Sequence, residues 1–175
     1  MTTSVFILIT CLLLSMFFSG TETAVTASSE ALIHELEKKG DQNAKRLKKL
    51  KNNPDRFLSM ILFGNNVVNI TATAVTTSLC ITFLGAEWGV FISTFVVSFI
   101  VLIFCEILPK TIAMRFPNTI ALNVAPIVSA LTFVLAPLVI FLNTIVRQAI
   151  KVCGLMKKEK LSHDERVELR GAIDL

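Results

Sequence analysis

The chain contains few charged residues and almost no tyrosine or tryptophan. Among its 175 residues there is no tyrosine and one tryptophan, and only 17% of the residues are charged, whereas soluble domains carry about a quarter. The charged residues also cluster, which leaves four long uncharged stretches: Met1–Thr21, Phe57–Ala86, Trp88–Cys105 and Phe116–Val146. About 20 apolar residues cross a hydrocarbon layer about 30 Å thick. The scarcity of charge therefore excludes an ordinary soluble domain and predicts an all-α polytopic protein of the lipid bilayer.

Other absences narrow the function. The chain has no P-loop, GxSxG or HExxH motif, so we expect no enzyme, and nothing in it indicates a nucleic-acid partner. The four cysteines and two histidines show no CxxC or Cys/His spacing, which argues against a disulfide framework or a zinc site. No basic residue precedes the first apolar run, and a signal peptide would have one. The first run is therefore interpreted as a membrane span.

Basic residues are concentrated between the first two uncharged stretches. Eight of them lie between residues 38 and 56, where the only acidic residues are Asp41 and Asp55; they are Lys38, Lys39, Lys45, Arg46, Lys48, Lys49, Lys51 and Arg56. The positive-inside rule places this segment in the cytoplasm, which puts the amino terminus outside and the carboxyl terminus inside an inner (plasma) membrane. Anionic lipid headgroups could bind along Lys38–Arg56; a solvated charged face is the alternative.

Three spans are predicted, at about 4–27, 57–84 and 88–114, with a pair of short juxtamembrane helices at about 28–52. Ser28 or Ser29 and Asp41 are expected to cap the two short helices, and Asn53 with Pro54 to start the second span.

The fourth apolar stretch contains Pro117, Pro126 and Pro137, and proline bends or breaks helices. A crossing there would also leave the basic residues of the tail outside, against the positive-inside rule. A broken in-plane or re-entrant segment at about 117–150 fits both observations, and a fourth span is the alternative.

Polar groups of all three predicted spans lie at one depth. Ser19 lies nine residues before Ser28, Asn66 nine after Phe57, and Glu106 nine before Arg115. At 1.5 Å per residue each lies about 13 Å from the inner boundary, close to the middle of the bilayer.

The second span adds a polar stripe. Asn66, Asn69, Thr73 and Thr76 recur at helical spacing, while Asn65 lies off the stripe and Gly64 can expose its backbone carbonyl. Hydrogen bonding between helices is the alternative role for this stripe.

Glu106 is the most informative single residue, because an intramembrane carboxylate is costly. It could form an ion pair with Lys110 one turn away, or remain protonated. Pro109 disturbs the same turn and frees backbone carbonyls, as in broken-helix ion sites. Hydroxyl, amide, carboxylate and carbonyl oxygens suit hard cations such as Mg²⁺ or Ca²⁺, and Na⁺ as well.

Three motifs, "FFSGTETA" (17–24), "GNNVVNI" (64–70) and "EILPKT" (106–111), resemble in order and spacing the transmembrane domain of the CorC/CNNM family of magnesium transporters. The resemblance implies three membrane helices, a belt-like juxtamembrane helix, a homodimer and a Mg²⁺ site.

Carried onto this chain, the implied ligands are Ser19, the Gly64 carbonyl, Asn66 and Glu106. Further residues could bind the ion or line its pathway: Ser15, Glu22, Thr23, Asn65, Asn69 and Thr73. Gly20, Pro109 and Lys110 are expected to shape the site, and Glu22 could equally brace the adjoining helices.

The sequence thus predicts a core that transports Mg²⁺, with export coupled to Na⁺ as one form of the reaction. A membrane-embedded Mg²⁺ sensor or partner-binding subunit is the rival. Residues 1–155 are assigned to the transmembrane domain and 156–175 to a cytoplasmic linker, in which Ser162 and Glu165 form a capping box. Relatives of this family continue into nucleotide-binding domains, so the tail is interpreted as the lead-in to an absent domain.

Overall fold

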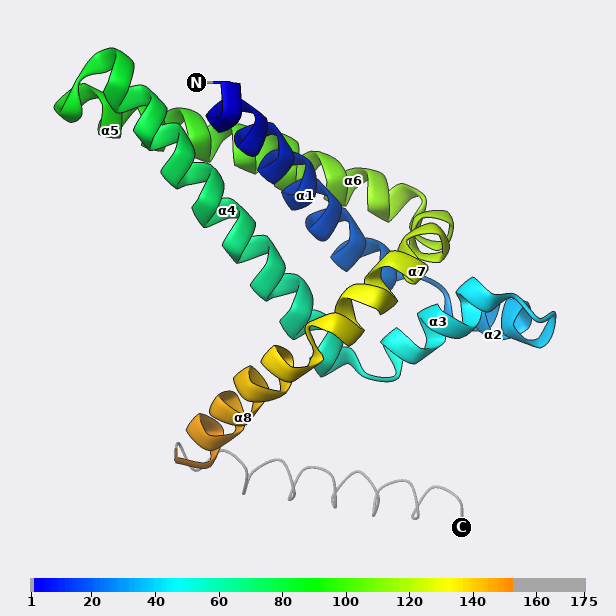
Figure 1. Ribbon diagram of the computed structural model, residues 1–175. Helices are drawn as coiled ribbons and strands as arrows, with labels where there is room; N and C mark the ends of the chain where they lie inside the picture. Colours follow the sequence, from blue (N-terminus) through cyan, green and yellow to red (C-terminus); the bar gives the residue numbers. More distant parts are fainter. Residues whose placement is uncertain (1, 153–175) are drawn as a thin grey trace, which may run out of the picture. The chain divides into compact units, whose positions relative to one another are not determined.

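The computed structural model describes residues 2–152, and every regular element in this range is helical (Figure 1). The elements are α1 (Thr2–Ala27), α2 (Glu30–Lys38), α3 (Gln42–Lys51), α4 (Pro54–Leu84), α5 (Ala86–Ile100), the π-helix η1 (Val101–Ile107), α6 (Leu108–Arg115), α7 (Pro117–Val134) and α8 (Ala136–Val152). Four helical stretches of the described part are long and apolar enough to span a membrane, namely Thr2–Ala27, Pro54–Leu84, Trp88–Arg115 and Pro117–Val134. The prediction of an all-α polytopic membrane protein is confirmed.

Met1–Ala136 form one compact unit, and the chain from Pro137 onward belongs to a second. The described part of the second unit is α8, which carries Pro137 beside its first residue. The capping box predicted at Ser162 and Glu165 lies outside the described residues.

In the first unit α1 packs against α4 on one side and against η1 and α6 on the other (Figure 1). α4 and α5 form a tight hairpin at Gly85, whose φ of +81° is readily available only to glycine. A Cβ on Gly89 would lie 2.7 Å from the backbone of Ile81, so glycine is required where the two helices meet. Within this unit, α1 is thus the central helix, in contact with α4, η1, α6 and α7.

The two short helices between α1 and α4 form as the capping residues predict. Ser29 accepts a hydrogen bond from Leu32 N, and Asp41 accepts from Asn43 N at 2.7 Å and from Ala44 N at 3.1 Å. Asn53 differs from expectation, because its side chain makes no cap bond and donates instead to the Lys49 carbonyl. Pro54 does begin α4.

The apolar face of the lysine-rich α3 is buried inside the protein. Leu47 and Leu50 are buried, and α3 packs mainly against α2 and α7. The basic side chains therefore project from the remaining surface of α3, while its leucines stabilise the protein interior.

Helix α7 contacts the segment between α1 and α4 at both of its ends. Near its start, Asn118 Oδ1 accepts a 2.8 Å hydrogen bond from the Ser29 backbone N–H. Near its end, Ser129 and Thr132 line a cavity together with Lys49 and Arg56. Both ends of an 18-residue helix are thus placed against one short segment of chain.

The prolines of the fourth apolar stretch act differently from one another. Pro117 begins α7 and Pro126 lies inside it, because the helix continues past that residue to Val134. The interruption falls at Leu135, which separates α7 from α8.

Candidate cation site

Ser19 lies between two residues of α1, Phe18 and Gly20, that contact neighbouring helices. On one side of it, Phe18 packs so tightly over Gly64 of α4 that a Cβ on Gly64 would stand 2.7 Å from the Phe18 Cζ. On the other side, a Cβ on Gly20 would stand 3.6 Å from the carbonyl oxygen of Pro109 in α6. The "GNN" segment therefore contacts α1 at Phe18, and the "EILPK" segment contacts it at Gly20. The three motifs thus come together at the two residues that flank Ser19.

The Ser19 side chain is buried and has no hydrogen-bond partner. It is 2% exposed, and its hydroxyl oxygen contacts no donor or acceptor within the described part of the chain. A buried hydroxyl without a partner costs about 1–3 kcal/mol, so such a group calls for an explanation by a ligand or a water molecule. Ser19 is the predicted ligand that the structure leaves most clearly available.

One turn earlier on α1, Ser15 joins two asparagines of α4. Its hydroxyl lies 2.7 Å from Asn69 Oδ1 and 3.0 Å from Asn65 Oδ1. A serine hydroxyl has a single hydrogen and can donate to only one of them at a time. Ser15 thus links α1 to two amide side chains of α4, and all three side chains carry oxygens of the kind that bind hard cations.

Glu106 lies in a segment where the helix is wound more loosely. Val101–Ile107 form the π-helix η1, and the Leu108 N–H bonds to the Ile103 carbonyl five residues back. Such π segments are rare and are often found at functional sites. The sequence predicted a disturbance at Pro109, whereas the structure places it one turn upstream, around Glu106 itself.

The segment that carries Glu106 packs against α1. The preceding residue, Cys105, is buried, and its thiol lies 3.6 Å from the Leu12 carbonyl. Glu106 and Lys110 are both half-buried, and among the ion pairs of the described residues none joins them. The alternative of an ion pair with Lys110 therefore has no support.

The remaining candidates differ in how far their side chains are buried. Asn66 and Thr73 are exposed on α4, and Thr73 donates to the Asn69 carbonyl at 2.9 Å. Glu22 and Thr23 are half-buried on α1, with Thr23 Oγ1 3.3 Å from the Ser19 carbonyl. Asn66 is thus the predicted ligand that the fold does not direct toward Ser19.

Sequence reasoning placed Asn65 outside the polar stripe and missed two further residues. Asn65 and Asn69, not Asn66 and Asn69, face Ser15, and their i,i+4 spacing could have indicated this. Thr21 has a buried hydroxyl that, like that of Ser19, makes no hydrogen bond in the described part of the structure. The other missed residue is Phe18, whose ring fills the space that a side chain at position 64 would need.

The donor set within the described residues consists of hard oxygens. No group of three histidine, cysteine, aspartate or glutamate side chains occurs there. Serine hydroxyls, asparagine amides and one carboxylate suit a hard cation better than a transition metal. Fold and site together define a multi-pass membrane domain with a polar centre.

Comparison with known proteins identifies the family. Residues 6–175 match the model of the Cyclin M transmembrane N-terminal domain, CNNM. The chain belongs to this family, and the resemblance inferred from the three motifs is confirmed.

Bacterial relatives agree with this assignment. The chain is 39% identical over 142 residues (81% of the chain) to the UPF0053 inner membrane protein YfjD of Escherichia coli (strain K12). It is 36% identical over 162 residues (91% of the chain) to a UPF0053 protein of Haemophilus influenzae. A more distant relative, 25% identical over 79% of the chain and 35% of its own length, is a polyamine export protein of the same species. The chain spans 33% and 38% of the length of the first two relatives.

Proposed function

We propose that this chain is the membrane core of a cation transporter whose cargo is Mg²⁺. The observation that carries the proposal is the buried, unpartnered hydroxyl of Ser19, held between the Gly64 and Pro109 contacts. Glu106 on the adjoining π segment would supply the negative charge, and the Gly64 carbonyl would be a further ligand. Asn66, which is exposed on α4, would join the proposed ligands only through a second copy of the chain. The oxygens of Ser15, Asn65 and Asn69 would line the pathway beside this site.

The chemistry favours a small hard cation. Mg²⁺ takes oxygen ligands, usually with few carboxylates, and retains water on the remaining positions. Transport would work by alternating access, with helices rearranging around a central site. Export driven by Na⁺ entry is the form we favour.

We place the segment between α1 and α4 in the cytoplasm, with the amino terminus outside and the carboxyl terminus inside. Because both ends of α7 contact that one segment, α7 would lie along the cytoplasmic surface. A crossing helix of 18 residues would separate its ends by about 27 Å of depth. The membrane would then be crossed three times, by α1, by α4 and by α5 with η1 and α6.

A homodimer fits the exposed polar groups. Asn66 is exposed on a membrane helix, where an amide facing lipid is unfavourable. A second copy of the chain packed on this face of α4 would cover it and could bring Asn66 into use as a ligand.

Two other functions have specific support. Two relatives are polyamine export proteins, which makes an organic polycation the second candidate cargo. A sensor that binds Mg²⁺ without transporting it would use the same ligands.

The test is flux into proteoliposomes that contain this chain, with Mg²⁺ and spermidine measured in parallel. Glu106→Gln keeps the size of the side chain and removes its charge, and we expect it to abolish Mg²⁺ flux. Glu30→Gln, an exposed carboxylate of α2, is the matched control and should leave flux unchanged.

Each alternative gives a different result. Spermidine flux without Mg²⁺ flux would establish the polyamine function. Saturable Mg²⁺ binding with no flux of either cation would support the sensor. Mg²⁺ flux that is equal in the parent and in Glu106→Gln would show that the proposed site is wrong.

A further inference from the structure

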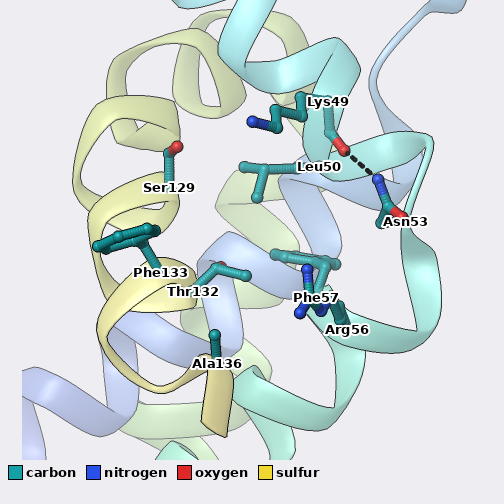
Figure 2. Close-up of a pocket in the computed structure, with 9 residues that line it drawn as sticks. All are labelled: Lys49, Leu50, Asn53, Arg56, Phe57, Ser129, Thr132, Phe133 and Ala136. Atoms are coloured by element: carbon teal, nitrogen blue, oxygen red, sulfur yellow. Dashed lines mark hydrogen bonds between the residues drawn. The ribbon is translucent and has the colours of Figure 1, made fainter. Parts of the chain in front are cut away.

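A second site lies apart from the bundle centre, in a cavity of about 160 Å³ between α3, the start of α4 and the end of α7 (Figure 2). One wall consists of Lys49, Leu50, Arg56 and Phe57, and the other includes Ser129 and Thr132. In Figure 2 the residues of α7 face those of α3 and α4 across the opening. At about 30 Å³ for each water molecule, the space holds about five, which is enough for a phosphate group.

Within the described part of the chain, the cations of this cavity have no counter-ion. Lys48 pairs with Glu37, Lys39 with Glu35 and Lys51 with Glu30, but no ion pair of the described residues involves Lys49 or Arg56. Thr132 gives its hydrogen to the Val128 carbonyl, which leaves Ser129 as the hydroxyl donor of the opposite wall. Two positive charges and one hydroxyl around one space are the chemistry that recognises a phosphate oxyanion.

The same cavity opens beside apolar surface. Phe57 and Leu50 are buried in its wall, while Phe133 at the rim is 82% exposed. Arg56 directly precedes the uncharged stretch of α4, so the cavity lies at the level where headgroups meet hydrocarbon, whichever way the protein is oriented. A free anion would gain nothing from Phe133, whereas a lipid would pack its acyl chains there.

We infer that this cavity binds the headgroup of an anionic phospholipid, with the phosphate between Lys49, Arg56 and Ser129 and the acyl chains along Phe133. The inference goes beyond the proposed transport and does not depend on the identity of the cargo. Bound lipid would join α7 to the first turn of α4 and so hold together two elements that flank the bundle.

The experiment measures phospholipid binding to the detergent-solubilised chain by native mass spectrometry, with phosphatidylglycerol and phosphatidylcholine titrated separately. The test variant is Lys49→Gln/Arg56→Gln. Lys45→Gln/Arg46→Gln is the control, because it removes the same charge from exposed positions of α3 that do not line the cavity. We expect phosphatidylglycerol to bind the test variant at least about tenfold more weakly than the control.

A second variant keeps the charges and fills the space. Ser129→Leu should weaken phosphatidylglycerol binding to a similar extent. The melting temperature of this variant in phosphatidylcholine reports whether it is folded. Equal losses in the test and control pairs would overturn the inference, since they would reflect general surface charge. Equal binding of phosphatidylcholine by the parent would overturn it as well. Displacement of the lipid by millimolar inorganic phosphate alone would show a site for free anions instead.

Discussion

Gly64 of α4 lies directly against the ring of Phe18 of α1. A Cβ at position 64 would stand 2.7 Å from the Phe18 Cζ and about as close to its two neighbours in the ring, at 3.0 and 3.1 Å. Since Phe18 is itself buried, its ring has little room to move. This contact sets the distance between two membrane helices at the level of the proposed site.

Gly64→Ala should therefore destabilise the protein by about 1–3 kcal/mol, the usual cost of overpacking. Thermal unfolding in detergent measures the effect. Gly20→Ala is the matched control, because its Cβ would meet Pro109 at 3.4 Å or beyond, an ordinary contact. Adding Phe18→Leu to Gly64→Ala should recover part of the loss, and a double mutant no more stable than Gly64→Ala would contradict this account.

Ser15→Ala removes the hydroxyl that lies between Asn65 and Asn69. We expect a loss of stability of about 1 kcal/mol, typical of a hydrogen bond between membrane helices. Thr10→Ala is the control, because its exposed hydroxyl bonds only within its own helix, to the Phe6 carbonyl. If the oxygens also line the ion pathway, Ser15→Ala will slow Mg²⁺ flux in liposomes and Thr10→Ala will not.

The position of α7 can be tested by cysteine labelling from either side of the membrane. In a chain whose own cysteines are replaced, single cysteines are placed at Thr119, Phe133, Lys45 and Ala86, all exposed. A surface-lying α7 predicts that positions 119 and 133 react from the same side as 45, with 86 reacting from the other. Labelling of 119 and 133 from opposite sides would show that α7 crosses.

The contact between α2 and α3 should weaken in acid. The hydrogen bond from Lys48 is the main reason that the pKa of Glu37 lies below its usual 4.5. A lowered pKa in the folded state gives stability that is present above pH 4.5 and is lost as the pH falls through the folded value. Hydrogen exchange of α3, corrected for intrinsic rates, should therefore accelerate in this range.

Glu37→Gln should remove that pH dependence. Glu35→Gln should keep it. The Lys39 side chain likewise lowers the pKa of Glu35, but that pair joins α2 only to its own C-cap residue and not to a second helix. An unchanged pH profile in Glu37→Gln would assign the effect to other groups.

Much of the architecture could be predicted because it depends on local properties of the chain. Runs without charge predicted the long helices, and Ser29, Asp41 and Pro54 marked helix starts where the structure has them. Asn53 does stand at the N-cap position of α4, but its side chain bonds backward to the Lys49 carbonyl and makes no cap bond.

The sequence predicts which residue types form the candidate site but not how they are arranged. Equal distances from the membrane boundary predict that Ser19, Asn66 and Glu106 lie at one level, yet each helical position turns by about 100° relative to the next. Which asparagine faces α1 therefore depends on how α4 is rotated, and the contact between Gly64 and Phe18 fixes that rotation. The buried state of Ser19 and Thr21 likewise follows from the neighbours that surround α1.

The sequence by itself determined that this is a multi-pass helical membrane protein of the CNNM family, because length, charge and motif order are properties of the chain alone. Only the tertiary structure decided that Asn65 joins Ser15, that the helix carrying Glu106 is loosely wound, and that both ends of α7 return to one segment. Those features depend on packing between distant parts of the chain, and a helical repeat in the sequence does not specify which neighbour each face will contact.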